Sequence, residues 1–310
     1  MNVFVAGGSG VLGSSVVRLL VEQGHVVTGL TSRESKRGAI ERLGARTAVA
    51  DALDAGALRR VVAEAEPEAV LSLLTRLPRR GPMTVRDLKP NVVLFSKGTA
   101  NVVAAAKAAG VGRLIAQSII FRYGYGDLPG ILTEETLPQA RAPARFAQSS
   151  LDGLRDLEHM VLAVDGIVLR YGLFYGSAAG HMATMETMLR RRVPVIFSPE
   201  RGALSWIHVD DAASATVAAF ERGKPGEVYN VVDDEPVSFA DFVREFASVI
   251  DAPSPRSIPR ALMRPFMRYA ALFSATSVRA SNAKAKRELG WSARYPTITE
   301  GMKELARPAA

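Results

Sequence analysis

The chain has 310 residues, of which 48% are hydrophobic and 23% charged, and its net charge is +8. This length allows one large domain or two lobes around a substantial core, with the composition of a soluble globular protein. Cysteine is absent and the four histidines are scattered, which excludes disulfides and a cysteine nucleophile and leads us to expect no metal site.

No apolar run reaches the length of a membrane span, and a predicted strand begins at once, without a signal peptide. We therefore expect a cytoplasmic protein without membrane contact. The basic residues are dispersed and accompany no nucleic-acid-binding motif, so we expect a solvated surface that at most attracts an anionic cofactor or substrate. The oligomeric state is left open, a homodimer included.

The first thirteen residues carry the strongest signal. An apolar strand over Val3–Ala6 leads into a glycine run with glycines at 7, 8, 10 and 13, and an apolar helix follows over Val11–Val21. Strand, glycine turn and helix in this order are typical of a dinucleotide-binding unit. The amides at the start of the helix would face the phosphates, so we assign cofactor contacts to Gly7, Gly10, Val11, Leu12 and Gly13.

Downstream, the first two-thirds of the chain alternate strands and helices. Further strands are predicted over 26–30, 47–50, 69–74, 113–121, 166–171 and 228–232, and helices over 91–109, 182–192, 210–222 and 239–249. An extended stretch is predicted at 193–199, and a long amphipathic segment ends at Phe273. Alternation of this kind predicts an α/β fold of the Rossmann type, a doubly wound parallel sheet with a smaller C-terminal substrate-binding lobe. We expect a dinucleotide-binding domain over 1–176, to which 205–232 return, and a substrate-binding lobe from 177–204 and 233–310.

The end of the second predicted strand bears on the choice of nicotinamide cofactor. An NAD-binding unit has a carboxylate there, about 20 residues after the glycines, for the ribose 2′-hydroxyl. This chain has Thr31, Ser32 and Arg33 instead. Hydroxyls and a guanidinium suit a 2′-phosphate, so we predict NADP(H); an ordinary solvated loop is the alternative.

Together these segments resemble the extended short-chain dehydrogenase/reductase family of the epimerase/dehydratase type, over almost the whole chain. Residues 6–13 look like its glycine motif, 98–101 like its GTxN helix, 169–176 like its LRxxNVYG segment and 288–291 like its C-terminal LGW. The resemblance places Asp51 and Ala52 beside the adenine and adds Leu74 and Tyr171 to the cofactor contacts. It implies the Rossmann fold and a nicotinamide cofactor.

The chain departs from this family at the catalytic pair, Tyr-x-x-x-Lys. None of its seven tyrosines has a lysine four residues later. Aligning Glu158 with the family's helix glutamate puts Ser150 at the tyrosine position and Leu154 at the lysine position, and the helical asparagine falls at Phe95. The chain therefore looks like an atypical member. We assign catalytic roles to Ser118, for orientation or oxyanion binding, and to Tyr123, with a strand-end serine and a pocket-lining tyrosine as the alternatives.

A site without the polar pair is wider and less polar, which suits a bulky, flat ketone better than a sugar nucleotide. We predict that residues from the loops and the 182–192 helix line it, although core packing explains several of them equally well. The predicted substrate-binding residues are Tyr125, Ser150, Tyr175, His181, Met182, Met185 and Trp206.

The sequence thus predicts an NADPH-dependent ketoreductase for a hydrophobic small molecule, polycyclic aromatic ketones being one class that fits. Its proton could come from a neighbouring hydroxyl of the substrate, from ordered water or from a phenol. Two alternatives stay open: a non-catalytic NADP(H)-binding regulator, and an epimerase or isomerase of the sugar-nucleotide type.

Overall fold

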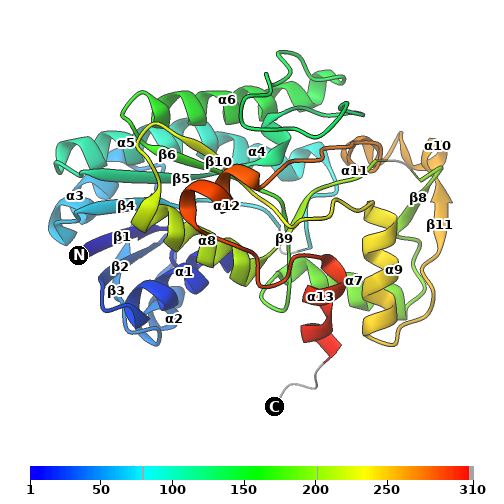
Figure 1. The fold of residues 1–310 in the computed structure, drawn as a ribbon, viewed down its shortest axis with the longest axis horizontal. Helices are drawn as coiled ribbons and strands as arrows, with labels where there is room; N and C mark the ends of the chain where they lie inside the picture. Colours follow the sequence, from blue (N-terminus) through cyan, green and yellow to red (C-terminus); the bar gives the residue numbers. More distant parts are fainter. Residues whose placement is uncertain (79, 201, 307–310) are drawn as a thin grey trace.

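The computed structural model describes residues 1–78, 80–200 and 202–306, and a seven-stranded parallel sheet forms its centre (Figure 1). The strand order is β10-β6-β5-β4-β1-β2-β3, and every pairing is parallel. The strands are β1 Asn2–Ala6, β2 Val26–Thr31, β3 Arg46–Val49, β4 Ala69–Ser72, β5 Arg113–Ile119, β6 Ile167–Tyr171 and β10 Val228–Val231. The order reverses between β1 and β4, and ligands of such sheets bind at the carboxyl ends of the strands beside this switch point.

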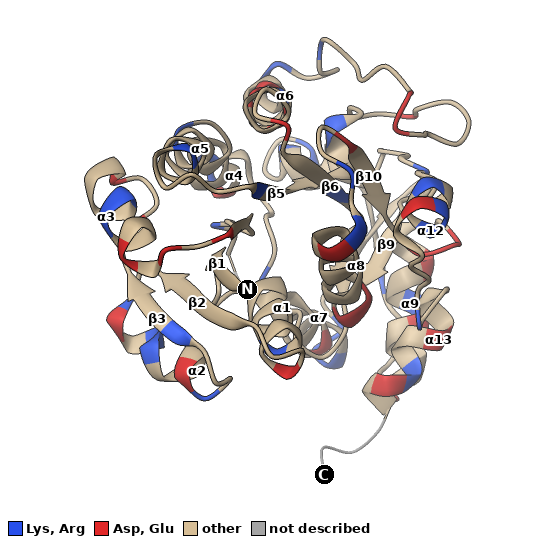
Figure 2. Cartoon of the chain, turned by 60° about the vertical axis from the view of Figure 1, so that its left-hand side comes forward, with Lys and Arg blue, Asp and Glu red and all other residues tan. Residues whose placement is uncertain are grey.

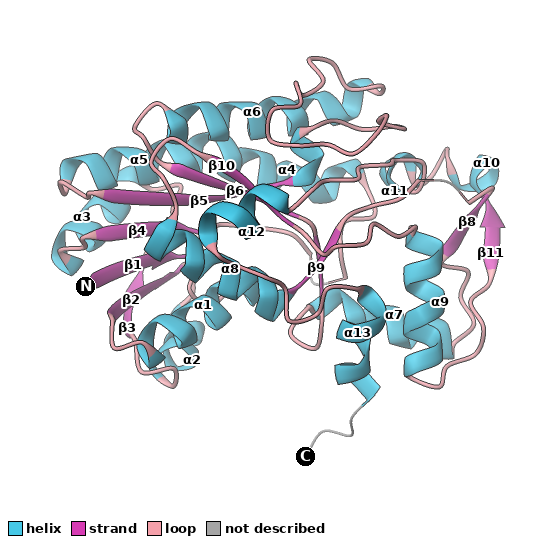
Figure 3. Cartoon of the chain, in the orientation of Figure 1, coloured by secondary structure: helices cyan, strands magenta, loops and turns pink. Residues whose placement is uncertain are grey.

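Alternate residues of each strand face two separate cores, one on each side of the sheet. On one side Phe4, Val70 and Ala116 pack against α3 (Ala55–Ala65), α5 (Thr99–Ala108) and α6 (Gln148–Leu162). On the other side Val5 and Leu71 pack against α1 (Val11–Glu22) and α8 (Val209–Arg222). Helices on both faces explain why the strands are apolar on both faces. Figure 3 shows these two helical layers.

The remaining elements form the smaller lobe at the carboxyl end of the sheet. They are β7 Leu173–Tyr175, α7 Gly180–Arg190, β8 Ile196–Ser198, β9 Trp206–His208, α9 Phe239–Val249, β11 Ser257–Pro259, α10 Arg260–Met263, α11 Arg268–Phe273 and α13 Ile298–Met302. Two parallel strand pairs, β7 with β9 and β8 with β11, organise it. By contrast, α12 (Ala283–Leu289) packs with α8 through Ala285 and Leu289 in the sheet's second core.

Three predicted elements differ in detail. The helix expected over 91–109 begins earlier, as α4 (Val85–Val93), and passes through a π-helical turn at Leu94–Gly98 before α5. A capping box at Thr84 and Asp87, which the apolar pattern did not reveal, sets this earlier start. In the stretch expected to be extended, 193–199, the strand β8 covers three residues. The long amphipathic segment is broken into β11, α10 and α11.

Lysines, arginines and acidic residues are interspersed over the outer helices rather than gathered by sign (Figure 2). Many of them pair within one helix, as Arg18 does with Glu22 and Arg190 with Glu186. Within the described ranges, no helix combines the length and the apolar character needed to cross a bilayer.

Candidate active site

The glycine turn after β1 lies against the end of β4, at the switch point. Gly7 has φ +90°, and a Cβ on it would approach the carbonyl oxygen of Leu73 to 2.6 Å. A Cβ on Gly13 would lie 2.1 Å from the carbonyl oxygen of Gly7. Gly7 and Gly13 are therefore required by the fold of the turn itself.

Gly10 differs from these glycines. It is exposed, its φ is −79°, and an added Cβ would meet only the Gly7 oxygen, at 3.1 Å. It is the N-cap of α1, where no side chain caps the helix and no acidic residue lies in the first turn. The amides at Val11 and Leu12 thus begin a helix whose N-terminus lacks a side-chain acceptor. A pyrophosphate fits such a terminus.

The end of β2 carries an unpaired cation. Thr31 is buried, and its hydroxyl accepts a hydrogen bond from Ser9 Oγ at 3.0 Å, which ties the strand end to the glycine turn. Ser32 and Arg33 are exposed, and the Arg33 guanidinium has no ion-pair partner among the described residues. Glu34 is instead held by Arg37, at 2.5 Å. A free guanidinium here is a fitting partner for a 2′-phosphate.

Asp51 and Ala52 follow β3 along the same edge. The Asp51 carboxylate accepts a hydrogen bond from the Leu53 amide and lies 3.3 Å from Arg76, contacts that together hold the pKa of Asp51 below its usual range. The Ala52 carbonyl accepts a hydrogen bond from Asn101 Nδ2 at 2.8 Å, so the asparagine of the GTxN segment supports this loop. Leu74 lies half-buried beyond β4, near Gly98.

Tyr171, the last predicted cofactor contact, ends β6. Its ring is 1% exposed, and its hydroxyl lies 2.6 Å from Thr216 Oγ1 on α8. Burial raises the pKa of this phenol. Its hydroxyl therefore already has a partner in the core.

Ser118 belongs to a buried ionic network. Its hydroxyl donates a hydrogen bond to Glu158 Oε1 at 2.7 Å. Arg170 donates two hydrogen bonds to the same carboxylate, of 2.8 and 2.7 Å. Glu158 and Arg170 are 5% and 6% exposed. The side chain of Ser118 thus turns toward α6 and is 1% exposed, which favours a structural role over the predicted contact with substrate.

Tyr123 is also enclosed. Its hydroxyl lies 2.8 Å from the Thr133 carbonyl and 2.9 Å from Asn230 Oδ1, and the Arg170 guanidinium sits 4.7 Å from its ring centre. It is 1% exposed, and burial raises its pKa. These contacts join the loop after β5 to the loop at Thr133 and to β10, and they argue against Tyr123 as the proton donor.

Tyr125 and Ser150 are brought together as a pair. The Tyr125 hydroxyl donates to Ser150 Oγ at 3.3 Å, and its ring stacks on Phe121 at 5.2 Å. The alignment on Glu158 places Ser150 at the family's tyrosine position, so a phenol from a different segment, the loop after β5, contacts the residue at that position. Leu154, at the lysine position, is fully buried in the core. Burial raises the pKa of Tyr125, and the pair is closed to solvent.

Two predicted substrate-binding aromatics lie in the core of the smaller lobe. Trp206 is 2% exposed, stacks on Phe242 at 3.8 Å and donates its indole N–H to the Val237 carbonyl. Tyr175 is fully buried, and its hydroxyl donates to the Thr297 carbonyl at 3.3 Å. The structure thus places both side chains in the packed core of the smaller lobe rather than at an open surface, and their contact with a substrate stays a prediction.

The first turn of α7 approaches the loop that follows β4. His181 is half-buried, and its Cβ is 3.8 Å from where a Cβ of Gly81 would lie. Burial lowers its pKa, so the imidazole is neutral near pH 7. Met182 is buried, while Met185 is partly exposed at the core's margin. His181 and Met185 remain the predicted substrate contacts that are open at this edge.

One cluster has the composition of a metal site. His208, Asp210 and Glu304 place ligand atoms within 4.8 Å of one another. However, His208 Nδ1 accepts a hydrogen bond from the Asp210 amide, so a neutral imidazole carries its proton on Nε2, which faces Glu304 at 3.4 Å. A protonated nitrogen has no lone pair for a metal, and the contact is that of a helix cap and a His–Glu pair.

The resemblance drew attention to Glu158 but not to the two arginines around it. Arg170 lies in the LRxxNVYG segment and Arg122 precedes the first Tyr-Gly pair. Because they are 48 residues apart in sequence (170 − 122), nothing local connects them. The sequence does contain one indication of this network. Arg170 is a charged residue in an otherwise apolar strand, and a buried charge requires a buried partner.

Comparison with known proteins agrees with this geometry. The sequence model of the NAD dependent epimerase/dehydratase family matches residues 3–231. The chain belongs to this family. It is 36% identical to a 3-diazoavenalumate denitrifying reductase from a Streptomyces species, over 97% of this chain and 99% of that protein.

Two further comparisons are with a ketoreductase sequence and with a solved dehydratase structure. A 4-hydroxy-2-methyl-3-oxo-4-farnesyl-3,4-dihydroquinoline-1-oxide ketoreductase from Stigmatella aurantiaca is 26% identical, over 98% of this chain and 96% of that one. The dTDP-glucose 4,6-dehydratase of Bacillus anthracis, solved in complex with NAD, superposes with a TM-score of 0.78 at 18% identity, over 99% of this chain and 95% of that one. Reductases among these relatives support an oxidoreductase; the superposition shows the shared fold.

Proposed function

We propose that this protein is an NADPH-dependent reductase of a hydrophobic small-molecule ketone, in which the protein itself donates no proton. The observation that carries the proposal is the pair at the start of α6. The alignment on Glu158 puts Ser150 and Leu154 in place of the family's acid and its lysine, and the phenol that contacts Ser150, that of Tyr125, is buried and donates a hydrogen bond to Ser150 Oγ.

The residues present fit the cofactor. The uncapped start of α1 would hold the pyrophosphate, and Arg33 would hold the 2′-phosphate. When bound, NADPH would supply a hydride to an electrophilic centre of the substrate. The contribution of this chain is to bind and orient both partners at the carboxyl edge, with the loop after β4 and the first turn of α7 as the walls.

A ketone reduced here still needs one proton at its oxygen. A hydroxyl next to the carbonyl can supply it, since an intramolecular donor is already in position. The ketoreductase relative's name gives its compound a 4-hydroxy group next to a 3-oxo group, which supports this substrate class. We therefore expect ketones with an adjacent hydroxyl to react and those without one to react poorly.

A second substrate class is favoured by the 36% identical relative, whose name describes denitrifying reduction of a diazo compound. Protonation of a diazo group by solvent gives a diazonium, to whose carbon the hydride supplied by NADPH would add, with release of N₂ and formation of a C–H bond. No oxygen has to be protonated in that step. A site without a protein acid therefore suits this chemistry as well.

The test is NADPH oxidation followed at the nicotinamide absorbance, with product identified by mass spectrometry. The probes are 2′-hydroxyacetophenone, acetophenone as its matched control without the hydroxyl, and 3-diazoavenalumate. We expect turnover with the first or the third probe and little with acetophenone. Absence of turnover with all three, while NADPH binds, would favour a non-catalytic NADP(H)-binding regulator.

The proton source is tested by Tyr125→Phe and, as a matched control, Tyr123→Phe. We expect both variants to retain turnover, because both phenols are buried and their hydroxyls are already hydrogen-bonded within the protein. If Tyr125→Phe alone abolishes reduction while NADPH binding is unchanged, Tyr125 is the acid and the substrate-assisted proposal is wrong.

A further inference from the structure

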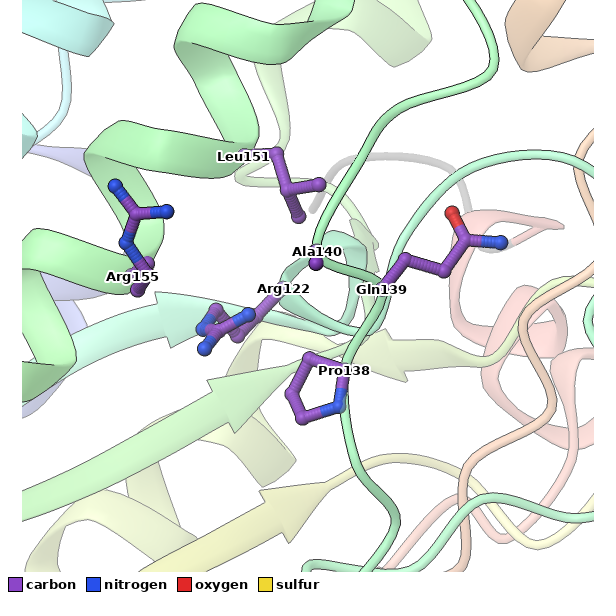
Figure 4. A pocket seen from close by; sticks show the side chains of 6 residues that line it. All are labelled: Arg122, Pro138, Gln139, Ala140, Leu151 and Arg155. Atoms are coloured by element: carbon purple, nitrogen blue, oxygen red, sulfur yellow. The ribbon is translucent and has the colours of Figure 1, made fainter.

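A small cavity lies beside α6, on the helix face that carries Leu151, Arg155 and Glu158. Its volume is about 170 Å³, and it lies between α6 and the segment at 138–140 (Figure 4). Its lining residues are Arg122, Pro138, Gln139, Ala140, Leu151 and Arg155. In Figure 4, Arg122 and Arg155 lie on the same side of the cavity, and Pro138, Gln139 and Ala140 line the facing segment.

The inner wall of this cavity carries an excess of buried positive charge. Glu158 is already held by two hydrogen bonds from Arg170 and one from Ser118. Arg122 reaches the same carboxylate only through Nε, at 3.3 Å and outside hydrogen-bond geometry, so this buried N–H has no acceptor among the described residues. Two guanidiniums thus share one carboxylate. Burial lowers the pKa of Arg122, and the nearby cations Arg170 and Arg155 add to this effect.

Arg155 supplies the second guanidinium at the cavity. It pairs with Asp152 at 3.0 Å and with Asp156 at 3.4 Å, and its side chain is 53% exposed. Exposed ion pairs of this kind contribute little free energy. The Arg155 side chain can therefore turn to an anion in the cavity at small cost, whereas Arg122 already borders it.

We propose that this cavity binds a small organic carboxylate. The two guanidiniums would receive the carboxylate group, to which arginine's planar donors are matched. Leu151, Pro138 and Ala140 offer the rest of the ligand an apolar wall. Inorganic phosphate would leave oxygens facing that wall without donors, so a carboxylate with a short hydrophobic body fits better.

The site is linked to the loop that follows β5. The Gln139 amide donates to the Tyr123 carbonyl at 2.8 Å, and Gln139 Oε1 accepts from the Tyr125 amide at 3.2 Å. A ligand held against Gln139 would thus stabilise the loop at the carboxyl edge. The inference is independent of the proposed reductase activity, since it requires only the folded chain.

The experiment is a ¹⁹F NMR titration with 4-fluorobenzoate, carried out on the full chain saturated with NADP⁺. We expect saturable binding at millimolar concentration, weaker binding of phosphate in competition, and no binding of the neutral 4-fluorobenzamide. Arg122→Gln and Arg155→Gln should each weaken binding, by about tenfold for Arg122. Ala140→Trp, which fills the cavity from an exposed position, should abolish binding.

Arg145→Gln is the matched control, because Arg145 is exposed on the same segment and does not line the cavity. It removes the same charge and should leave the dissociation constant unchanged. If Arg122→Gln fails to fold, Arg155→Gln and Ala140→Trp still test whether the carboxylate binds in this cavity. Binding that Ala140→Trp and Arg155→Gln leave unchanged would overturn the proposal, as would tighter binding of phosphate than of 4-fluorobenzoate. Turnover of the reductase probes is measured separately, so either proposal can fail alone.

Discussion

At the residue scale, the glycines of the first turn serve two different roles, one in the fold of the turn and one at the expected cofactor site. Gly7 and Gly13 are excluded from carrying a side chain by backbone atoms within 2.6 Å of the Cβ that would be added. Gly10 is exposed and has ordinary dihedral angles, and a Cβ there would meet only the Gly7 oxygen, at 3.1 Å, which requires a shift of a few tenths of an ångström. The glycine pattern in the sequence does not separate them, whereas their neighbours in the structure do.

This difference predicts opposite outcomes for one substitution. Gly10→Val should lose NADPH binding, because its side chain would project at the start of α1, yet it should fold, as circular dichroism would show. Gly13→Val should destabilise the domain itself, since its Cβ meets the Gly7 carbonyl. Normal NADPH binding by Gly10→Val would mean that the turn serves packing alone.

A second prediction at this scale concerns Arg33. Arg33→Ala should cost about 1.5–3 kcal/mol of NADPH affinity, the magnitude of a hydrogen bond to a charged group, and leave NADH affinity nearly unchanged. Isothermal titration calorimetry with both cofactors measures it. Arg42→Ala, which removes an exposed cation after α2 (Arg37–Glu41), is the control. Equal affinities of the unmodified protein for NADH and NADPH would refute the preference for NADP(H).

At the scale of elements, α6 is anchored to the sheet by charge as well as by apolar packing. Its inner face carries Leu154, Leu157 and Val161 into the core, and Glu158 between them binds Ser118 on β5 and Arg170 on β6. The helix that bears the catalytic pair in the family is therefore fixed to the two strands below it. This anchor persists although the pair itself is absent.

Glu158→Gln should destabilise the protein by about 3–5 kcal/mol, because it leaves two buried guanidiniums without their counter-charge. The free energy of unfolding in urea measures the loss. Asp156→Asn removes an exposed carboxylate from the same helix and should change stability by less than about 0.5 kcal/mol. If the two variants were equally stable, the network would contribute nothing to the fold.

At the scale of the whole molecule, the smaller lobe is joined to the sheet through buried polar groups. Asp233 follows β10, and its amide donates to the Trp206 carbonyl on β9 at 2.7 Å. Its carboxyl is 1% exposed, and neither oxygen has a hydrogen bond of normal geometry. Burial, with a contribution from the nearby Asp211, raises the pKa of Asp233 to about 8. This carboxyl is therefore protonated in the folded protein at neutral pH.

A pH dependence of stability follows from this. Between about pH 4 and pH 8 the folded state keeps a proton that the unfolded chain, with an ordinary pKa of about 3.9, has released. The contribution of this bound proton to the free energy of unfolding is fully present below about pH 4 and is lost as the pH rises to about 8. The free energy of unfolding falls by at most about 1.4 kcal/mol per pH unit in this range. Asp233→Asn should flatten this slope in urea unfolding measured from pH 5 to 8. An unchanged slope in the variant would show that Asp233 is ionised in the native state.

The sequence alone determined the parallel sheet, the glycine turn and the family resemblance. These features depend on local patterns: apolar runs of strand length, a glycine spacing and short motifs in a fixed order. The strand positions agree within a few residues, as for β5, predicted over 113–121 and found at Arg113–Ile119. The sequence also shows directly that no tyrosine is followed by a lysine four residues later, because this depends only on residue type at a given spacing.

Only the tertiary structure decided which polar and aromatic residues are available for chemistry. Four predicted site residues are of types that often take part in catalysis or ligand binding, but the fold buries them: Ser118, Tyr123, Tyr175 and Trp206. Their partners are distant in the chain, as Glu158 is for Ser118. The pairing of Tyr125 with Ser150, and the two arginines that share Glu158, depend on how three separate segments pack. A side chain's burial and partners are set by the whole fold, which local sequence patterns do not encode.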